Sequence, residues 1–226
     1  MNLQKVAAIE IRNLAVGLPE LMKYGEGKEM KTAIRKKPVE RVFLSKEKFQ
    51  GDDVADLKHH GGPDRAVCIY PYEHYALWEK EFGKPLPASA FGENVTAANM
   101  LEETVFIGDI YRLGEAVIQV NQGRVPCSTI DRNLDMTPLL KAMVKTGFTG
   151  YMCRVLEEGY VSADSSLELL EQHPQKVSVL YTNQVFFHEP KNIEGIKRIL
   201  AVPELADEWR DKFEMRLSNL LKKQAE

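Results

Sequence analysis

Short runs along most of the chain alternate between apolar and polar positions, which is the period-2 pattern of β-strands. The clearest run is 115–122, where Ile118 and Val120 fall on one side. The near-continuous apolar run 66–70 ends at Pro71 and is typical of a buried strand. Further strand patterns occupy 6–11, 30–39, 39–44, 94–97, 110–113 and 150–157. Many short strands with few helices between them favour a closed or sandwich-like β core over a doubly wound sheet.

Two segments within this β-rich region change to helical spacing. After Pro71, aromatic residues recur three and four positions apart as far as Phe82, and Gly83 can end that helix. A second helix is predicted between the N-cap candidate Thr137 and Gly147.

Beyond Gln175 the alternation stops and helical spacing takes over. Helices are predicted over 177–187, over 193–200 after the N-cap candidate Asn192, and from Pro203 towards the end of the chain. The sequence therefore predicts a mainly β fold with α-helices in two domains, a β-rich domain over 1–170 and a three-helix module over 176–226. A module of this size is stable only if it packs against the rest of the protein.

Composition and charge exclude several classes of protein. Apolar residues make up 44% of the 226 positions and charged residues 28%, as in an ordinary globular protein. The net charge of −3 provides no field for holding a polyanion, so no nucleic-acid partner is expected. No apolar run approaches the roughly 18 residues of a membrane span, and Glu10 and Arg12 interrupt the run near the N-terminus. We therefore expect a cytoplasmic protein with no membrane partner.

The three cysteines differ in their surroundings. Cys68 and Cys153 lie in apolar strand patterns and are expected to be buried, unreactive thiols. Cys127 lies in a Gly- and Pro-containing segment after a strand, with Arg124 and Arg132 nearby. Neighbouring cations favour the thiolate, which is the form that acts as a nucleophile or metal ligand. An inert loop thiol is the alternative. With no C-x-x-C pair and fewer than four cysteines, a self-held iron–sulfur cluster is not expected.

Two further segments are rich in basic residues. The segment 58–65 contains His60 beside two glycines, with Asp64 and Arg65 following. The adjacent histidine pair is a weak metal-site signal, and the turn is equally suited to an anionic group. An ordinary polar turn is the alternative. The segment 28–37 contains five basic residues. Charge runs are usually solvated, but strand alternation would direct one set of its side chains into a pocket.

Six separated motifs, taken in order, resemble the MOSC domain, the C-terminal domain of molybdenum cofactor sulfurases, in its YiiM-like bacterial branch. The resemblance covers about residues 5–170, and the helical tail is similar to the three-helix module that follows the domain in that branch. The motifs are Thr-Ala-Ile-Arg-Lys-Lys-Pro-Val at 32–39, His-His-Gly-Gly-Pro-Asp-Arg-Ala at 59–66, Tyr-Pro-Tyr-Glu-His-Tyr at 70–75, Phe-Gly-Glu-Asn at 91–94, Gly-Asp at 108–109 and Arg-Val-Pro-Cys at 124–127.

The resemblance implies a MOSC-type β-barrel-like domain over 1–170, a molybdopterin-type molybdenum cofactor, and reduction of N-hydroxylated compounds such as hydroxylaminopurine-type base analogues. Cys127 matches the cysteine that supplies a thiolate to molybdenum, which makes it both the metal ligand and the catalytic residue. The residues expected to bind the cofactor are Thr32, Lys36, His60, Asp64, Arg65, Asn94, Arg124 and Ser128.

The chain has no flavin, haem or cluster motif, so the reductase hypothesis requires a separate electron-donor reductase. A homodimer is left open. Two alternatives remain: a carrier of the cofactor or a sulfur-transfer protein that uses Cys127 without turnover, and a metal-free thiol enzyme that pairs Cys127 with His60.

Overall fold

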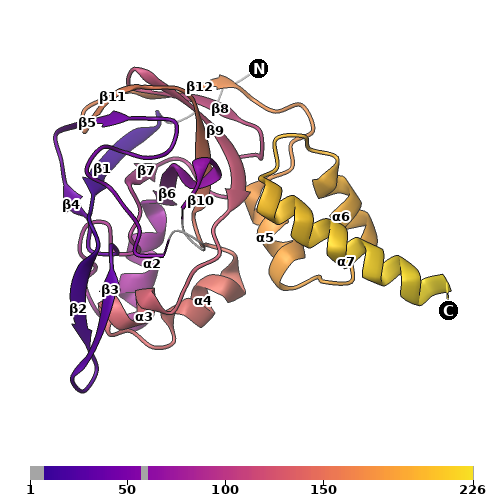
Figure 1. The fold of residues 1–226 in the computed structure, drawn as a ribbon, viewed down its shortest axis with the longest axis horizontal. Helices are drawn as coiled ribbons and strands as arrows, with labels where there is room; N and C mark the ends of the chain where they lie inside the picture. Colours follow the sequence, from indigo (N-terminus) through magenta and orange to yellow (C-terminus); the bar gives the residue numbers. More distant parts are fainter. Residues whose placement is uncertain (1–7, 57–60, 226) are drawn as a thin grey trace.

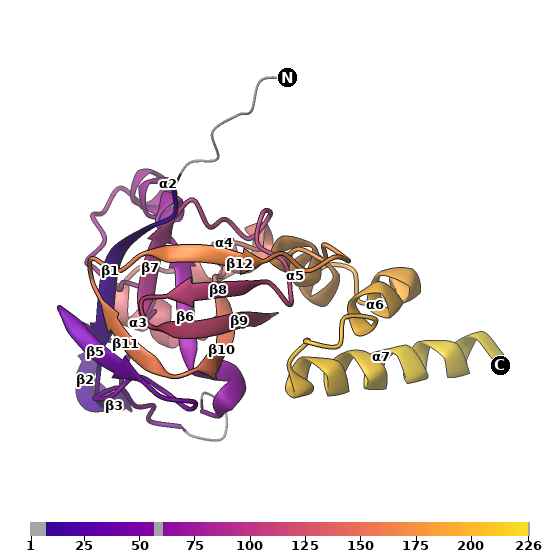
Figure 2. The same cartoon turned by 90° about the horizontal axis from the view of Figure 1, so that it is seen from above.

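The computed structural model describes residues 8–56 and 61–225. Its main element is an eight-stranded sheet that curls into a half-barrel, and the helices of the C-terminal region lie to one side of it (Figures 1 and 2). The neighbouring strands are antiparallel except for one parallel pair. Their order across the sheet is β12 (Leu167–Glu171), β8 (Ile110–Leu113), β9 (Ala116–Gly123), β10 (Tyr151–Glu157), β6 (Val67–Pro71), β7 (Val95–Ala98), β1 (Glu10–Val16) and β4 (Lys37–Pro38), with β6 and β7 parallel.

Two small sheets complete the β domain. A hairpin pairs β2 (Glu20–Tyr24) with β3 (Lys28–Thr32), and β5 (Arg41–Leu44) pairs with β11 (Gly159–Ser162). A short 3₁₀ helix, η1 (Pro63–Arg65), lies against β10.

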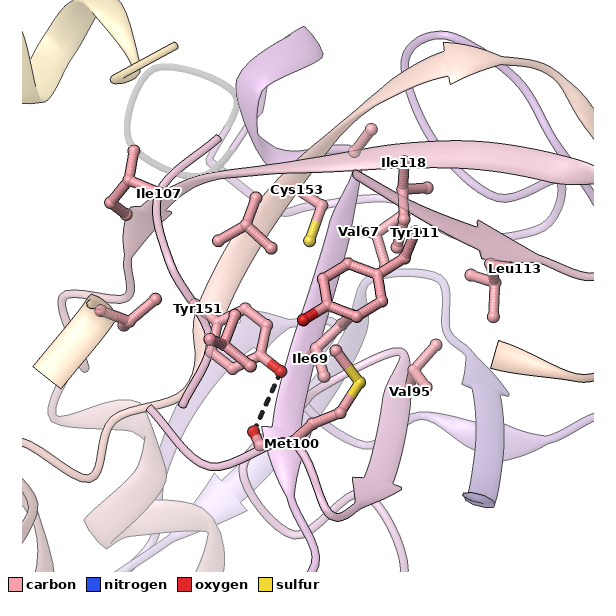
Figure 3. Packing of buried hydrophobic residues seen from close by; sticks show 14 of the residues in the cluster. Val67, Ile69, Val95, Met100, Ile107, Tyr111, Leu113, Ile118, Tyr151 and Cys153 are labelled. Carbon is pink, nitrogen blue, oxygen red and sulfur yellow. Dashed lines mark hydrogen bonds between the residues drawn. The ribbon is translucent and has the colours of Figure 1, made fainter. Parts of the chain in front are cut away.

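The main hydrophobic core fills the concave side of the curled sheet. Alternate residues of β10 point inwards, so that Tyr151 and Cys153 are fully buried beside Ile69 of β6 (Figure 3). The Tyr151 hydroxyl donates a hydrogen bond of 3.1 Å to the Met100 carbonyl, so this polar group is paired inside the core. Burying an aliphatic side chain such as that of Ile69 contributes about 1.5–3 kcal/mol to the free energy of unfolding.

A second core lies under α2 (Glu73–Phe82), α3 (Thr129–Leu134) and α4 (Leu139–Thr146). Trp78 at its centre is fully buried and donates its indole N–H to the Tyr70 hydroxyl at 2.7 Å. The Tyr70 ring stacks on Phe91 with 4.0 Å between centroids. Phe91 and Ile130 of α3 belong to the same buried cluster, which fixes the turn that contains Phe91.

The C-terminal module consists of α5 (Val179–Phe187), α6 (Ile193–Leu200) and α7 (Asp207–Ala225). Ser178 and Asn192 cap α5 and α6 by accepting main-chain hydrogen bonds of 3.1 and 2.8 Å. Phe186 of α5 stacks on Trp209 of α7, with 4.4 Å between centroids. These contacts build a small core within the module.

The module also packs tightly against the β domain. The Asn183 amide donates to the Gly147 carbonyl at 2.8 Å, and the Ala206 N–H donates to the Asn121 carbonyl at 3.0 Å. A side chain at Gly123, the last residue of β9, would overlap the Asn183 side chain. The absence of a Cβ at this position therefore allows α5 to approach the sheet.

The predicted fold class, a mainly β domain with helices followed by a three-helix module, is confirmed. The single strand predicted over 30–39 is wrong in detail, because β3 ends at Thr32 and the chain turns before β4. The Lys36 N–H donates to the Ile34 carbonyl at 3.0 Å in this turn, which breaks the alternation. No described helix has the length and apolar character needed to cross a membrane.

Candidate functional site

A cavity of about 700 Å³ lies where the β domain meets the C-terminal module. This volume is within the range of about 300–1,000 Å³ that is typical of small-molecule sites. The cavity is lined by residues from several distant segments of the chain. The predicted site residues among them are Thr32, Lys36, Arg65, Asn94, Arg124 and Cys127.

Cys127 is half-buried on the wall of this cavity. It lies in the loop between β9 and α3, and its carbonyl accepts a 3.1 Å hydrogen bond from the Ile130 N–H at the start of α3. The loop is also tied to the sheet, because the Arg124 N–H donates to the Gly150 carbonyl at 3.0 Å. The thiol is therefore accessible from the cavity while its backbone is held at both ends.

The Arg124 guanidinium has unused hydrogen-bonding capacity. Its Nη2 donates to the Phe91 carbonyl at 2.6 Å, whereas its Nη1 is buried and has no partner among the described residues. Burial lowers the pKa of Arg124, but its interactions with Cys68, Cys127 and Glu93 outweigh burial and raise the pKa overall. Arg124 is thus a fixed cation with a free donor, which is the arrangement expected of an anion-binding residue.

Glu93 supports Arg124 from outside the cavity and was not predicted from the sequence. Its carboxylate is fully buried and accepts hydrogen bonds from the Tyr75 hydroxyl, from Thr96 Oγ1 at 2.7 Å and from the Phe91 N–H at 3.1 Å. Burial, together with the Glu93 charge, raises the pKa of Tyr75, so Tyr75 remains a donor. Glu93 fixes the turn whose carbonyl holds Arg124.

Asp52, which was also not predicted, links two of the predicted residues. Its Oδ1 pairs with Lys36 Nζ and accepts from the Gly17 N–H at 2.8 Å, and its Oδ2 accepts from the Asn94 side-chain amide at 2.9 Å. Asn94 Oδ1 in turn accepts from the Cys68 N–H at 3.1 Å. Lys36 therefore has a neutralising partner, and the polar atoms of Asn94 are used within the protein.

Cys68 is buried, as predicted, but it also lines the cavity. Burial raises the pKa of its thiol, and the Arg124 charge opposes this shift. Cys153 is fully buried in the main core, and burial raises its pKa well above the ordinary value. Burial therefore favours the protonated form of both thiols, and the half-buried Cys127 is the most accessible thiol of the three.

Asp64 and Arg65 occupy η1 but have different surroundings. Asp64 is not among the cavity-lining residues: its Oδ1 binds the Arg154 guanidinium at 2.7 Å, and its Oδ2 accepts from the Asp207 N–H of α7 at 3.2 Å. Arg65 lines the cavity and pairs with Glu208 of α7. Burial lowers the pKa of Arg65.

The other predicted residues lie in three different settings. Thr32 is buried on the cavity wall, where its hydroxyl accepts from the Ile34 N–H at 3.2 Å. Ser128 is exposed next to Cys127 and is not among the lining residues. His60 lies outside the described residues.

Helix α7 contributes Glu208, Trp209 and Lys212 to the cavity, a role that was not predicted from the sequence. Glu208 pairs with both Arg65 and Lys212. We call Arg65, Glu208 and Lys212 the α7 wall. We call Lys36, Asp52, Arg124 and Cys127, together with the supporting Glu93, the barrel wall.

The barrel wall can stabilise a bound anion and present a thiolate to a soft metal. Thiolate sulfur is a ligand that suits soft metal centres, and a buried guanidinium with a free N–H suits phosphate or carboxylate oxygens. Within residues 8–56 and 61–225, no group of three or more His, Cys, Asp or Glu side chains could hold a metal ion.

Comparisons with known proteins agree with this description of the chain. Residues 56–168 match the MOSC domain, and residues 177–220 match the YiiM-like, 3-alpha helix domain. The uncharacterized protein YflK of Bacillus subtilis is 43% identical over 212 residues, which cover 93% of this chain and 96% of YflK. A protein of Gibberella moniliformis named "Reductase" is 36% identical over 178 residues, which cover 76% of this chain and 31% of that longer protein.

The fold is also similar to a solved structure. The crystal structure of YiiM from Geobacillus stearothermophilus aligns with a TM-score of 0.79 and 36% sequence identity, covering 92% of this chain and 99% of that one. Sequence and fold thus agree over nearly the whole length of both proteins. The chain belongs to the MOSC-domain family, in the branch that carries a YiiM-like three-helix domain.

Proposed function

We propose that this chain is an oxidoreductase that holds a molybdenum cofactor at Cys127 and reduces N-hydroxylated compounds. The observation that carries the proposal is the presence, on one cavity, of the half-buried Cys127 thiol and of Arg124, whose Nη1 has no partner among the described residues. Membership of the MOSC-domain family and similarity to a protein named a reductase support it.

The residues present fit such a cofactor. Cys127 is available as a soft thiolate ligand, and Arg124 has a buried donor that an anionic group of the cofactor would satisfy. The molybdopterin form of the cofactor ends in a phosphate, so cations on the cavity wall suit it. Lys36, paired with Asp52, supplies a second positive group on the same wall.

The bound cofactor would supply the two-electron chemistry that cleaves an N–O bond. Converting an N–OH group to N–H consumes two electrons and two protons and releases one water molecule. The chain's own part is to hold the thiolate of Cys127 in place and to keep Arg124 charged beside it. The polar groups behind them are already paired, so they need no rearrangement as the reaction proceeds.

The electrons come from outside the chain in this proposal. The sequence contains no motif for a flavin, a haem or a self-held cluster. A separate reductase is therefore the proposed electron donor.

The proposal is tested with protein purified from a host that makes the molybdenum cofactor. Molybdenum content is measured by elemental analysis, and N-hydroxyadenine reduction is followed with a chemical electron donor. We expect Cys127→Ala to lose most of the bound molybdenum and nearly all turnover, because the thiolate ligand is gone.

Cys68→Ala is the matched control, since Cys68 lines the same cavity but is buried, which favours its protonated form. We expect it to retain molybdenum and to change mainly stability. Full turnover by Cys127→Ala, or by protein without molybdenum, would overturn the proposal. Bound molybdenum with no turnover under any donor would instead favour a cofactor carrier.

A further inference from the structure

The α7 wall carries two cations and one carboxylate where α7 of the C-terminal module meets η1 of the β domain. We infer that Arg65 and Lys212 form a subsite for a phosphate monoester, and that the substrate is an N-hydroxylated purine nucleoside monophosphate rather than a free base. This inference rests on the proposed function for its reacting group. The phosphate subsite is a separate feature of the structure.

The subsite is held in a fixed position by contacts between the two domains. Asp64 accepts a hydrogen bond from the first N–H of α7, and the preceding residue, Ala206, donates to the Asn121 carbonyl at 3.0 Å. Trp209 is buried next to Glu208 and packs on Phe213, with 5.9 Å between ring centroids. Lys212 is one helical turn beyond Glu208 on the same face of α7. The packing of α7 against the β domain therefore brings Arg65 and Lys212 to the same carboxylate.

The charges of this wall are not balanced. Glu208 is the carboxylate that both cations contact, so two cations share one carboxylate here. Asp64, the neighbour of Arg65 in the chain, is itself paired with Arg154. The two cations lie close together, because they contact the two oxygens of one carboxylate. Burial, followed by the charge of Arg65, lowers the pKa of Lys212, in agreement with this geometry. An added anion would relieve the repulsion between the two cations. A phosphate suits the trio, because Arg offers a planar pair of donors and Lys a compact point charge.

Arg65 is expected from the family resemblance to bind the cofactor, but it lies with Lys212 and Glu208, so in this inference it binds the phosphate of the substrate instead. The cofactor is proposed at Cys127 and Arg124, which belong to the barrel wall and have their own free donor. The α7 wall lines the same cavity but comes largely from the other domain. A nucleotide whose base faces Cys127 would extend towards this second set of cations.

The test is to compare the binding of adenosine 5′-monophosphate, the product that such a substrate would give, with the binding of adenosine. The two dissociation constants are measured by calorimetry at constant ionic strength, on the full chain with its cofactor bound. We expect the wild type to bind the monophosphate roughly tenfold more tightly than adenosine, as for a charge-assisted contact. Lys212→Met should remove the difference without weakening adenosine binding, and Lys212→Arg should preserve it. Equal affinities in the wild type would overturn the inference.

Lys222→Met is the matched control, since Lys222 is exposed in the last turn of the same helix and does not line the cavity. We expect it to bind the monophosphate as the wild type does. Inorganic phosphate should compete with the monophosphate in the wild type. A loss of molybdenum in Lys212→Met would assign the phosphate to the cofactor and overturn the substrate assignment.

The two proposals fail in different ways. If the protein binds the monophosphate selectively but reduces no N-hydroxylated compound, the proposed function is wrong and the phosphate subsite is supported. Reduction of N-hydroxyadenine, with no preference for the monophosphate, would remove the subsite and leave the proposed function.

Discussion

The two walls of the cavity hold their positive charges in different ways. On the barrel wall each cation has its own support: Lys36 pairs with Asp52, and both side chains are less than a tenth exposed. Arg124 is fixed by a main-chain carbonyl that Glu93 holds in place. Such buried, fully paired supports keep a site rigid.

On the α7 wall, Arg65 and Lys212 share Glu208, whose side chain is 44% exposed. Solvent weakens these ion pairs, so a phosphate could replace the carboxylate at little cost. The comparison indicates that the barrel wall suits a permanently bound group, whereas the α7 wall suits a ligand that binds and dissociates.

The largest effect is expected when Glu93 is removed from the barrel wall. Glu93→Ala leaves three buried donors without an acceptor, and we expect a loss of about 4 kcal/mol in the free energy of unfolding, measured in urea. Glu81→Ala, at an exposed position of α2, is the control and should change stability by less than about 0.5 kcal/mol. A loss below about 1 kcal/mol in Glu93→Ala would show that the barrel wall is not rigidly supported.

A smaller loss is expected for Asp52→Asn. This variant leaves the buried Lys36 ammonium without a negative partner. It keeps an acceptor for Gly17 but replaces the oxygen that accepts from Asn94 with a donor, and we expect about 3 kcal/mol of destabilisation in total. Adding Lys36→Met should recover part of the stability in urea unfolding, because the unpaired charge is then gone. If the double variant is no more stable than Asp52→Asn, the ion pair is not the reason for the loss.

The smallest effect on stability is expected on the α7 wall. Glu208→Gln should cost less than about 1 kcal/mol, since the pairs that it breaks are partly solvated. The same variant should bind adenosine 5′-monophosphate about twofold to fivefold more tightly in calorimetry, because Glu208 no longer competes with the phosphate. Weaker binding would mean that Glu208 positions the two cations rather than competing for them.

The sequence predicted the parts of the site that depend on local chemistry. Cys127 stands out from Cys68 because a loop with nearby arginines surrounds it, whereas Cys68 lies within an apolar strand. Helical spacing identified all three helices of the module, including the 193–200 segment that forms α6. These predictions depend on neighbours within a few residues along the chain.

The missed residues depend on contacts between distant segments. Asp52 meets Asn94 across 42 positions, and Arg65 meets Glu208 across 143. Periodicity places Trp209 on an apolar helix face, but it does not specify which surface that face covers. Ion pairs between the two domains therefore could not be predicted from local sequence patterns.

Gly123 shows how the two domains act on each other. Because Asn183 fills the space that a side chain would occupy there, the module has no clearance to pivot at this point of contact. The glycine is the fourth residue before Cys127, so a displacement of α5 would be transmitted through the end of β9 to the thiol-bearing loop. A larger side chain at position 123 would therefore have to displace either Asn183 of α5 or the strand end that leads to Cys127.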